Sequence, residues 1–342
     1  MSFRKELKES YEILRSALKD EDLMYEEALV FDERYSTTFR PFLQGIALGS
    51  GLSLRKVLIL NAMETISKAE NAKRKNGRLR TACLFAAVPP QWTQDNQSLL
   101  LRNYDFPKPF DLIARNLIVT ILKQPDKVPT AIIGMPGQIY CPTCLNSQGL
   151  FLELNNGMPS GGYDVHYERK SMLIKMLEYM QESATLEELS NALRATPSDY
   201  SLILNAGSDS GVISHEFSST NGSVEVAVER REPFVSTNYF LSPLWGLPPP
   251  DNIKSWFGPL RRLNMLKLLN ERRGELSLES AQSLMGLDLK EGGSAWPLTR
   301  SIRTIYQLVY QPATRRLALR SGHQAQWAHF ALAPWLTNTA PL

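Results

Sequence analysis

The sequence predicts an α+β protein in which sheets pack in layers against helices, and two observations carry this prediction. Runs of strand type are grouped in the middle and near the end of the chain, whereas helical periodicity is grouped at the start, in a central block and after residue 258. Strands and helices do not alternate one by one, as they would in a repeated βαβ unit. Layered sheets are therefore expected rather than a parallel doubly wound sheet.

The composition is that of a soluble globular protein. The chain has 342 residues, 43% hydrophobic and 21% charged, which is enough for two ordinary domains or one large core. A net charge of +3 is too small to indicate a polyanionic partner, and no apolar run approaches the roughly 18 residues of a membrane-spanning helix. The amino terminus lacks the apolar core of a signal peptide, and three cysteines do not make a disulfide framework. We therefore expect a cytoplasmic protein in a reducing environment, with no nucleic-acid partner and no membrane span.

The amino-terminal part is predicted to be helical. Apolar side chains recur at helical spacing from Leu7 to Leu18, which indicates an amphipathic helix. A turn-rich stretch follows, then an apolar segment over residues 42–48. Ser53 is a suitable cap for a second helix over residues 54–65.

A strongly basic, glycine-punctuated run follows at residues 73–80 and ends three residues before Cys83. A nucleic-acid contact is one interpretation, but no aromatic residues interleave and the net charge of the chain is low. A solvated linker is the interpretation that we favour.

A lone cysteine, Cys83, stands at the head of a predicted strand over residues 83–87. A second predicted strand, residues 98–101, ends in Arg102, and Asp105 follows three residues later. If the two strands pair as a hairpin, the thiol, the guanidinium and the carboxylate converge. A neighbouring guanidinium lowers the pKa of a thiol and so makes it a nucleophile.

The remaining elements follow from periodicity and turn residues. The predicted strands are residues 130–133, 149–154, 201–205, 211–217, 223–230, 234–238, 301–310 and 316–320, the last two joined as a hairpin. The predicted helices are residues 172–180, a segment from the capping box at 185–188 to about 194, residues 260–269, and a segment from Ser277 or Ser280 to about 285.

Cys141 and Cys144 form a CxxC pair between two predicted strands. Such a pair indicates redox chemistry or half of a zinc site. The chain has no second CxxC and no histidine at ligand spacing, which argues against zinc. The pair does not open a helix after a strand, which argues against a thioredoxin-like role. We favour a loop with incidental thiols.

His215 lies beside Glu216 within a predicted strand. A papain-like pairing of His215 with Cys83 is one interpretation, but nothing in the spacing indicates it. A structural histidine is the interpretation that we favour.

Taken together, the motifs from about residue 42 to about residue 322 resemble the cysteine N-terminal-nucleophile (Ntn) hydrolases of the choloylglycine hydrolase and acyl-coenzyme A:isopenicillin N acyltransferase group. Three positions depart from the pattern of that family: Ala82 stands where glycine is common, Leu84 where threonine is usual, and Tyr239 where acyltransferases often have histidine. The matching positions, in the order of the family, are Cys83, Arg102 and Asp105 of an R-N-x-D element, the turn 133–137, the N-x-x-G-L step 146–150, Asn155 or Asn156, the T-N step ending at Asn238, Arg261 or Arg262, and the final hairpin.

The resemblance implies a four-layer αββα sandwich of two mainly antiparallel sheets. Residues 1–82 would be a helical pro-segment or α chain, and residues 83–342 the catalytic domain. The precursor would cut itself between Ala82 and Cys83, and we expect the pro-segment to stay docked because its helices have apolar faces to bury. The implied substrate is a small-molecule acyl amide or acyl thioester, with neither metal nor organic cofactor. Association into a homo-oligomer is left open.

The resemblance also implies a role for each site residue. Cys83 would be the nucleophile, and its freed α-amine would take the thiol proton. Asp105 would orient that amine, and Arg102 would keep the thiol as thiolate. The other implied site residues are Asn238 with Asn155 or Asn156 as oxyanion donors, and Arg262 or its neighbour Arg261 beside them.

Two other functions stay open at the level of the sequence. The first is a binding protein that kept the fold and lost processing, which Leu84 favours. The second is a thiol-redox protein that uses Cys141 and Cys144.

Overall fold

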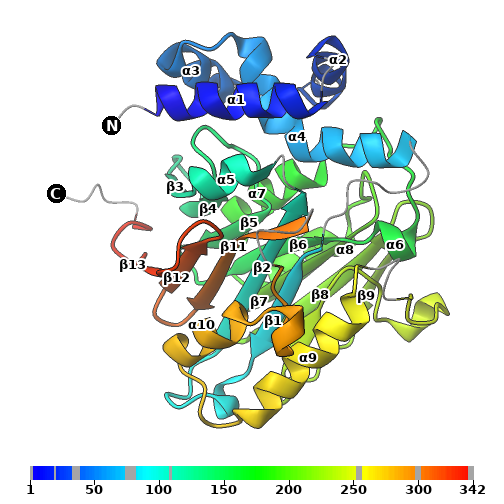
Figure 1. Ribbon diagram of the computed structural model, residues 1–342, viewed down its shortest axis with the longest axis vertical. Coiled ribbons are helices and arrows are strands. Elements are labelled where there is room, and N and C mark those ends of the chain that lie inside the picture. The colour runs from blue at the N-terminus through cyan, green and yellow to red at the C-terminus, as the bar shows by residue number, and fades with distance from the viewer. Residues whose placement is uncertain are drawn as a thin grey trace.

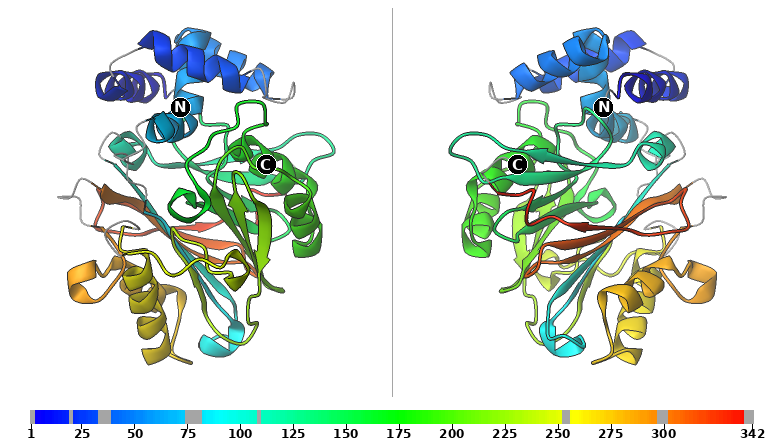
Figure 2. Two further views of the ribbon diagram at one scale, coloured as in Figure 1. Left: turned by 90° about the vertical axis from the view of Figure 1, so that its right-hand side faces the viewer. Right: turned by 90° about the vertical axis from the view of Figure 1, so that its left-hand side faces the viewer.

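The computed structural model describes residues 3–18, 21–32, 39–73, 82–107, 110–251, 256–296 and 302–337. Within these residues the chain forms two antiparallel sheets that face each other, with helices on their outer sides (Figures 1 and 2). The predicted α+β class with layered sheets is thus confirmed. No helix among the described residues combines the length and the hydropathy that crossing a membrane requires.

The first sheet has six strands, and two of its inner strands, β1 (Leu84–Val88) and β2 (Leu99–Pro107), lie beside the candidate nucleophile. β1 and β2 are buried along their whole length, because the facing sheet covers one side of them and helices cover the other. They pair antiparallel, with Phe85 opposite Arg102, so the predicted hairpin is confirmed. In spatial order the strands are β10 (Phe234–Ser236), β1 (Leu84–Val88), β2 (Leu99–Pro107), β11 (Ile302–Gln311), β12 (Arg316–Ser321) and β13 (Ala328–Ala331).

The second sheet has seven strands in sequence order, each antiparallel to the next. The ring of Phe151 in this sheet stacks on that of Phe85 in the first, with ring centres 5.8 Å apart, so the two sheets share one apolar core. The strands are β3 (Ile118–Leu122), β4 (Thr130–Gly134), β5 (Thr143–Asn146), β6 (Phe151–Asn156), β7 (Leu202–Ser208), β8 (Gly211–Ser218) and β9 (Gly222–Val226).

Helices cover both outer faces (Figure 2). α7 (Met172–Glu182) and α8 (Leu186–Arg194) pack on the seven-stranded sheet, and α9 (Gly258–Glu271) and α10 (Leu278–Gly286) pack on the six-stranded sheet. The predicted capping box at the start of α8 is present: Glu188 N donates to Thr185 Oγ1 at 3.2 Å and Thr185 N donates to the Glu188 carboxylate at 3.1 Å. The shorter helices are α5 (Asp111–Arg115) and α6 (Met158–Gly161), with single 3-10 turns at Pro90–Trp92, Pro243–Trp245 and Leu289–Glu291.

Four amino-terminal helices gather at one end of the molecule, beyond the ends of the strands (Figure 1). They are α1 (Arg4–Leu18), α2 (Glu21–Asp32), α3 (Arg40–Ser50) and α4 (Leu54–Lys73). The stretch expected to be rich in turns is therefore a helix, α2, and the second predicted helix continues past residue 65. Buried apolar residues of these helices belong to the core that fills the space between the sheets. The predicted basic linker lies outside the described residues from position 74 onward.

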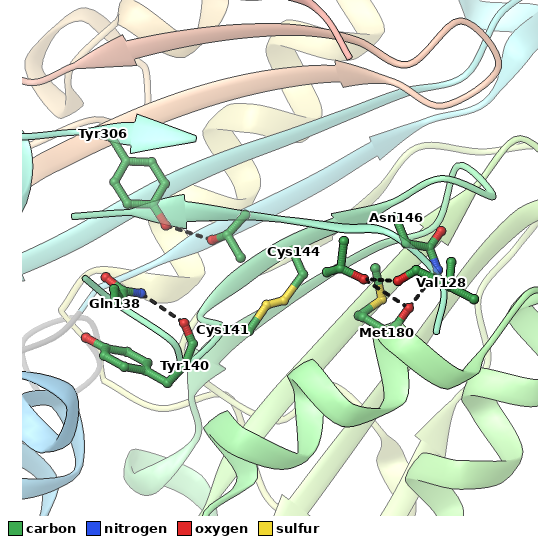
Figure 3. Close-up of a disulfide and its surroundings, with 10 residues drawn as sticks. Val128, Gln138, Tyr140, Cys141, Cys144, Asn146, Met180 and Tyr306 are labelled. Atoms are coloured by element: carbon green, nitrogen blue, oxygen red, sulfur yellow. Dashed lines mark hydrogen bonds between the residues drawn. A yellow bond between two sulfur atoms is a disulfide. The ribbon is translucent and has the colours of Figure 1, made fainter. Parts of the chain in front are cut away.

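The sulfur atoms of Cys141 and Cys144 are joined as a disulfide (Figure 3). The expectation of a loop with incidental thiols is therefore wrong, because the Cα atoms lie 5.8 Å apart and Cys144 belongs to β5, an inner strand of the second sheet. Between them, the hydroxyl of Thr143 lies 2.7 Å from that of Tyr306 on the facing sheet. In this form neither sulfur is available as a zinc ligand or a free thiol.

Candidate active site

Cys83 directly precedes β1, and its side chain is buried between the two sheets. Because Leu84 pairs with Asn103 across the β1–β2 ladder, Tyr104 lies opposite Cys83 and Arg102 lies diagonal to it on the same face. The thiol Sγ is 4.0 Å from Nη2 of Arg102. The register of two strands therefore brings together the thiol and the guanidinium that the sequence placed nineteen residues apart.

The Arg102 guanidinium is held by the facing sheet. Its Nη2 donates to the carbonyl oxygen of Leu154 at 2.9 Å, and its Nη1 forms an ion pair with the carboxylate of Glu153. Both charged side chains are fully buried. A buried guanidinium next to a buried carboxylate keeps its charge at a fixed position, from which it acts on the thiol.

Glu153 is a site residue that the sequence reasoning missed. It alternates with Phe151 and Asn155 along β6, so it faces the first sheet although its neighbours on that face are mostly apolar. Its carboxylate also accepts a hydrogen bond from Asn205 Nδ2, and Asn205 Oδ1 accepts one from Ser214 Oγ at 2.8 Å. The sequence did contain a signal for Glu153: it is a charged residue at a strand position that faces the core. Such a residue needs a buried partner of opposite charge.

Asp105 lies on the opposite face of β2, where it contacts Arg261 of α9. Arg261 Nη2 forms an ion pair with Asp105, and its Nη1 donates to the carbonyl oxygen of Cys83 at 3.2 Å. Thr304 Oγ1 donates to the other carboxylate oxygen at 2.7 Å. The backbone oxygen of Asp105 accepts from the backbone N–H of Ala82 at 3.2 Å. Asp105 and Arg261 thus hold the backbone on both sides of the nucleophile.

Burial raises the pKa of Asp105 to about 6, although Arg261, Thr304 and Arg102 each oppose that rise. The carboxylate therefore titrates closer to neutrality than an exposed aspartate does.

The arginine expected in the site was Arg262, with Arg261 as the alternative, and in the structure it is Arg261 that contacts Asp105 and the Cys83 carbonyl. Arg262 is half-buried, and its Nε donates to the carbonyl oxygen of Val235 at 2.9 Å. Arg261 is fully buried because its position on α9 points at β1 and β2, whereas the next residue is turned about 100° around the helix axis.

The expected oxyanion donors lie at the ends of β6 and β10. Asn155 faces the first sheet, and its Nδ2 donates to Ser236 O at 3.4 Å. Asn156 faces the other way, and its Oδ1 accepts from Met158 N at the start of α6. Asn238 Nδ2 donates to the carbonyl oxygen of Asn156 at 3.1 Å. Of the two adjacent asparagines, Asn155 is thus the one that shares a face with Glu153.

His215 is not brought to Cys83. Its Nε2 lies 3.1 Å from Ser190 Oγ of α8 and 3.8 Å from Glu225 of β9, on the outer side of the second sheet. Burial lowers its pKa, so the ring is neutral near pH 7. The structural interpretation of His215 agrees with this position.

A pocket of about 80 Å³ lies between the sheets at the far end of β1 from Cys83. Val88, Leu100 and Phe234 contribute apolar walls, and Ser208, Ser210 and Arg230 contribute polar groups. The thiol itself is covered by side chains, with 1% of its surface exposed.

No protein-family model matches the sequence, and no curated protein matches it in a sequence search. Among solved structures, a variant of the conjugated bile acid hydrolase from Clostridium perfringens matches with a TM-score of 0.53 and 14% identity, over 73% of this chain and 92% of that one. The chain shares the fold of this hydrolase. A second mutant of the same hydrolase matches with a TM-score of 0.51, 13% identity and the same coverage. The N-acylethanolamine-hydrolyzing acid amidase ortholog of Caenorhabditis elegans gives 0.47 and 13%, over 67% of this chain and 93% of that one.

The resemblance predicted from the motifs is thus confirmed at the level of the fold. In this chain the two antiparallel sheets are present and Cys83 directly precedes a buried strand.

Proposed function

We propose that this protein is a cysteine Ntn hydrolase or acyltransferase that cuts itself between Ala82 and Cys83 and then acts on a linear amide C–N bond. The observation that carries the proposal is the placement of Cys83: its thiol lies 4.0 Å from the buried Arg102, and its carbonyl accepts from Arg261, which is paired with Asp105. These groups sit in a fold shared with an amide hydrolase. A shared fold does not by itself assign an activity, so the proposal rests on the site.

In the self-cleavage step, the Cys83 sulfur attacks the Ala82 carbonyl carbon while its proton passes to the departing Cys83 nitrogen. This breaks the peptide C–N bond and leaves a thioester. Water then hydrolyses the thioester, which gives a free carboxylate on Ala82 and restores the thiol. The backbone of Ala82 is already held by Asp105, which fixes the bond to be cut.

In turnover, the freed α-amine of Cys83 takes the thiol proton, directly or through water. An α-amine has a pKa of about 7.7–8.0 in model peptides, so part of it is unprotonated near neutral pH. The thiolate attacks the substrate carbonyl, the amine leaves with a proton, and the acyl-cysteine passes to water or to another amine. Asn238 and Asn155 would hold the oxyanion, each contributing about 3 kcal/mol to lowering the barrier.

Residues 1–82 would be the pro-segment or α chain in this scheme and would stay attached after cleavage. Their helices bury Tyr11, Leu14 and Leu43 in the shared core, so a cut at Ala82 removes a covalent link and leaves the apolar contacts in place. The substrate class we propose is a small-molecule acyl amide. The cytoplasmic location stays a prediction.

A processing-deficient binding protein is a second candidate, and one observation favours it. The Nδ2 group of Asn238 is already engaged by a backbone carbonyl, and Leu84 follows the nucleophile where threonine is usual in the resembled family.

The intact mass of the purified protein, beside a Cys83→Ala control, separates the two candidates. Two fragments, the second beginning at Cys83, are expected in the wild type and one chain in the control. A single uncut chain in both would reject self-cleavage and leave the binding protein as the better candidate.

A further inference from the structure

The helical end of the molecule places a carboxylate inside the core next to the site. Glu64 lies on α4, with none of its surface exposed, and its Oε1 accepts a hydrogen bond from Tyr104 Oη at 2.5 Å. Neither the motif order nor the proposed mechanism gives this residue a role. A buried carboxylate is costly unless its contacts are retained for a purpose or offset elsewhere.

α4 is fixed to the segment that connects β4 and β5 of the second sheet, one turn before this carboxylate. Asn61 Oδ1 accepts from the backbone N–H of Ile139 at 2.9 Å, and Asn61 Nδ2 donates to the carbonyl oxygen of Gly137 at 3.0 Å. Asn61 and Glu64 are three residues apart, so they lie on the same face of the helix. The face of α4 that enters the core therefore carries two polar side chains. Asn61 bonds the backbone of Gly137 and Ile139, and Glu64 bonds Tyr104.

The contact of Glu64 reaches the nucleophile through the ring of Tyr104, which is itself held by stacking. The ring of Tyr104 stacks on that of Tyr306, with centres 4.6 Å apart, and the Arg102 guanidinium carbon lies 5.2 Å from the centre of the Tyr104 ring. Arg102 in turn lies against the Cys83 thiol. A phenol that donates to a carboxylate carries more negative charge on its ring, and the ring face is what attracts a guanidinium.

We propose that Glu64 is a positioning residue of the site: through Tyr104 it holds Arg102 against the Cys83 thiol, so that α4 is a component of the site and not only a cover. This inference deepens the proposed function and rests on it. It assigns the amino-terminal helices a part in the reaction that persists after the chain is cut, because Glu64 stays in contact with Tyr104 only while α4 is docked.

The test is an ultraviolet titration of the Cys83 thiolate in the full chain as purified, with all variants compared in the same state of cleavage, read as the difference from a Cys83→Ser variant. The other two cysteines are paired, so they do not contribute. Glu64→Ala and Tyr104→Phe both remove the Tyr104–Glu64 hydrogen bond and are expected to raise the measured pKa of the thiol by about one unit, a tenfold loss of thiolate. Glu64→Gln keeps an acceptor oxygen at the same place but not the charge, and it is expected to raise the thiol pKa by less than Glu64→Ala does.

The direction of the change separates positioning from simple charge repulsion. A carboxylate that acted on the thiolate only by repulsion would raise the thiol pKa, so removing it in Glu64→Ala and Glu64→Gln alike would lower that pKa. That result would overturn the proposal, and so would a Tyr104→Phe variant that titrates like the wild type. If Glu64→Ala does not fold, Tyr104→Phe decides alone.

Asn61→Ala is the matched control for docking. It removes the contacts of α4 with Gly137 and Ile139 and leaves Glu64 and Tyr104 intact. An equal shift in Asn61→Ala would mean that loose docking explains the effect and would overturn the positioning role. The titration needs neither substrate nor self-cleavage, so a protein that is never cut and still shows the shift would reject the proposed function and retain this inference.

Discussion

The carboxylate of Glu153, on β6 of the second sheet, pairs with the guanidinium of Arg102, on β2 of the first. Both side chains have no exposed surface, and the pair joins the two sheets beside the Cys83 thiol. A residue that lies fifty-one positions later in the chain therefore helps to fix the position of the guanidinium.

We expect Glu153→Gln to destabilise the protein by about 3–5 kcal/mol, because it leaves the Arg102 charge buried without its counter-ion. Urea unfolding followed by circular dichroism measures this. Glu182→Gln is the control, since Glu182 pairs with Lys127 at the surface and its loss is expected to cost less than about 1 kcal/mol. Equal losses in the two variants would show that the buried pair does not hold the sheets together.

Arg261 and Arg262 are adjacent in the sequence and differ in their expected effect on self-cleavage. Arg261→Lys loses the forked contact that joins Asp105 to the Cys83 carbonyl, and we expect the cleavage rate to fall at least about tenfold. Arg262→Lys changes contacts with the Val235 carbonyl and the Tyr239 side chain and none with Asp105 or Cys83 that the structure records, so its rate is expected to stay within about twofold of the wild type. Gel analysis of cleavage over time gives both rates, and the reverse order would assign the site to Arg262.

We expect Asp105 to give the proposed self-cleavage a pH dependence. Its pKa is raised to about 6 by burial, so the carboxylate is charged above that pH and neutral below it. The charged form holds Arg261 at the Cys83 carbonyl, and we therefore expect the cleavage rate to rise as the pH increases through about 6. The sign for stability is opposite: a pKa above the unfolded value of 3.8 means that stability present at low pH is lost as the pH rises through 6.

Rates of self-cleavage between pH 4 and 8 test this assignment, with Asp105→Asn as the control. The asparagine variant is expected to cleave slowly at every pH, without the rise. If it showed the same rise, another group would be titrating.

Asn155 and Asn156 offer a second matched pair. Asn155→Ala is expected to lower amide turnover about a hundredfold or more through loss of an oxyanion donor. Asn156→Ala removes the hydrogen bond to Met158 N at the start of α6, so we expect a loss of stability of about 1 kcal/mol and a smaller effect on turnover. Steady-state rates with a small acyl amide measure the effect on turnover, and thermal unfolding measures the effect on stability. Turnover that fell only in Asn156→Ala would reverse the assignment.

The sequence predicted most of the elements because their signals are local. The β1–β2 hairpin, the capping box of α8 and the final hairpin each depend on residues close together in the chain. α2 was missed because its apolar and charged residues do not form a clear stripe, and its burial depends on contacts with α4.

Part of the geometry of the candidate site was predicted for the same reason. Cys83, Arg102 and Asp105 lie on one hairpin, so strand pairing alone brings them together. Glu153 and Glu64 reach the site from a different sheet and from a helix, and no spacing along the chain encodes such contacts. The choice between Arg261 and Arg262 depends on the rotation of α9 about its axis, which the sequence pattern does not fix to within one residue.

The Cys141–Cys144 disulfide gives the last prediction. Alkylation of the unreduced, denatured protein is expected to label one thiol per chain, Cys83, and reduction is expected to expose two more. Replacing both cysteines with serine is expected to lower the free energy of unfolding by about 2 kcal/mol, because the bond closes only a short loop.

Self-cleavage is expected to continue in that double serine variant, since the nucleophile and its partners remain. A thiol–disulfide exchange activity that is lost in the double serine variant and retained in Cys83→Ala would instead show a thiol-redox protein.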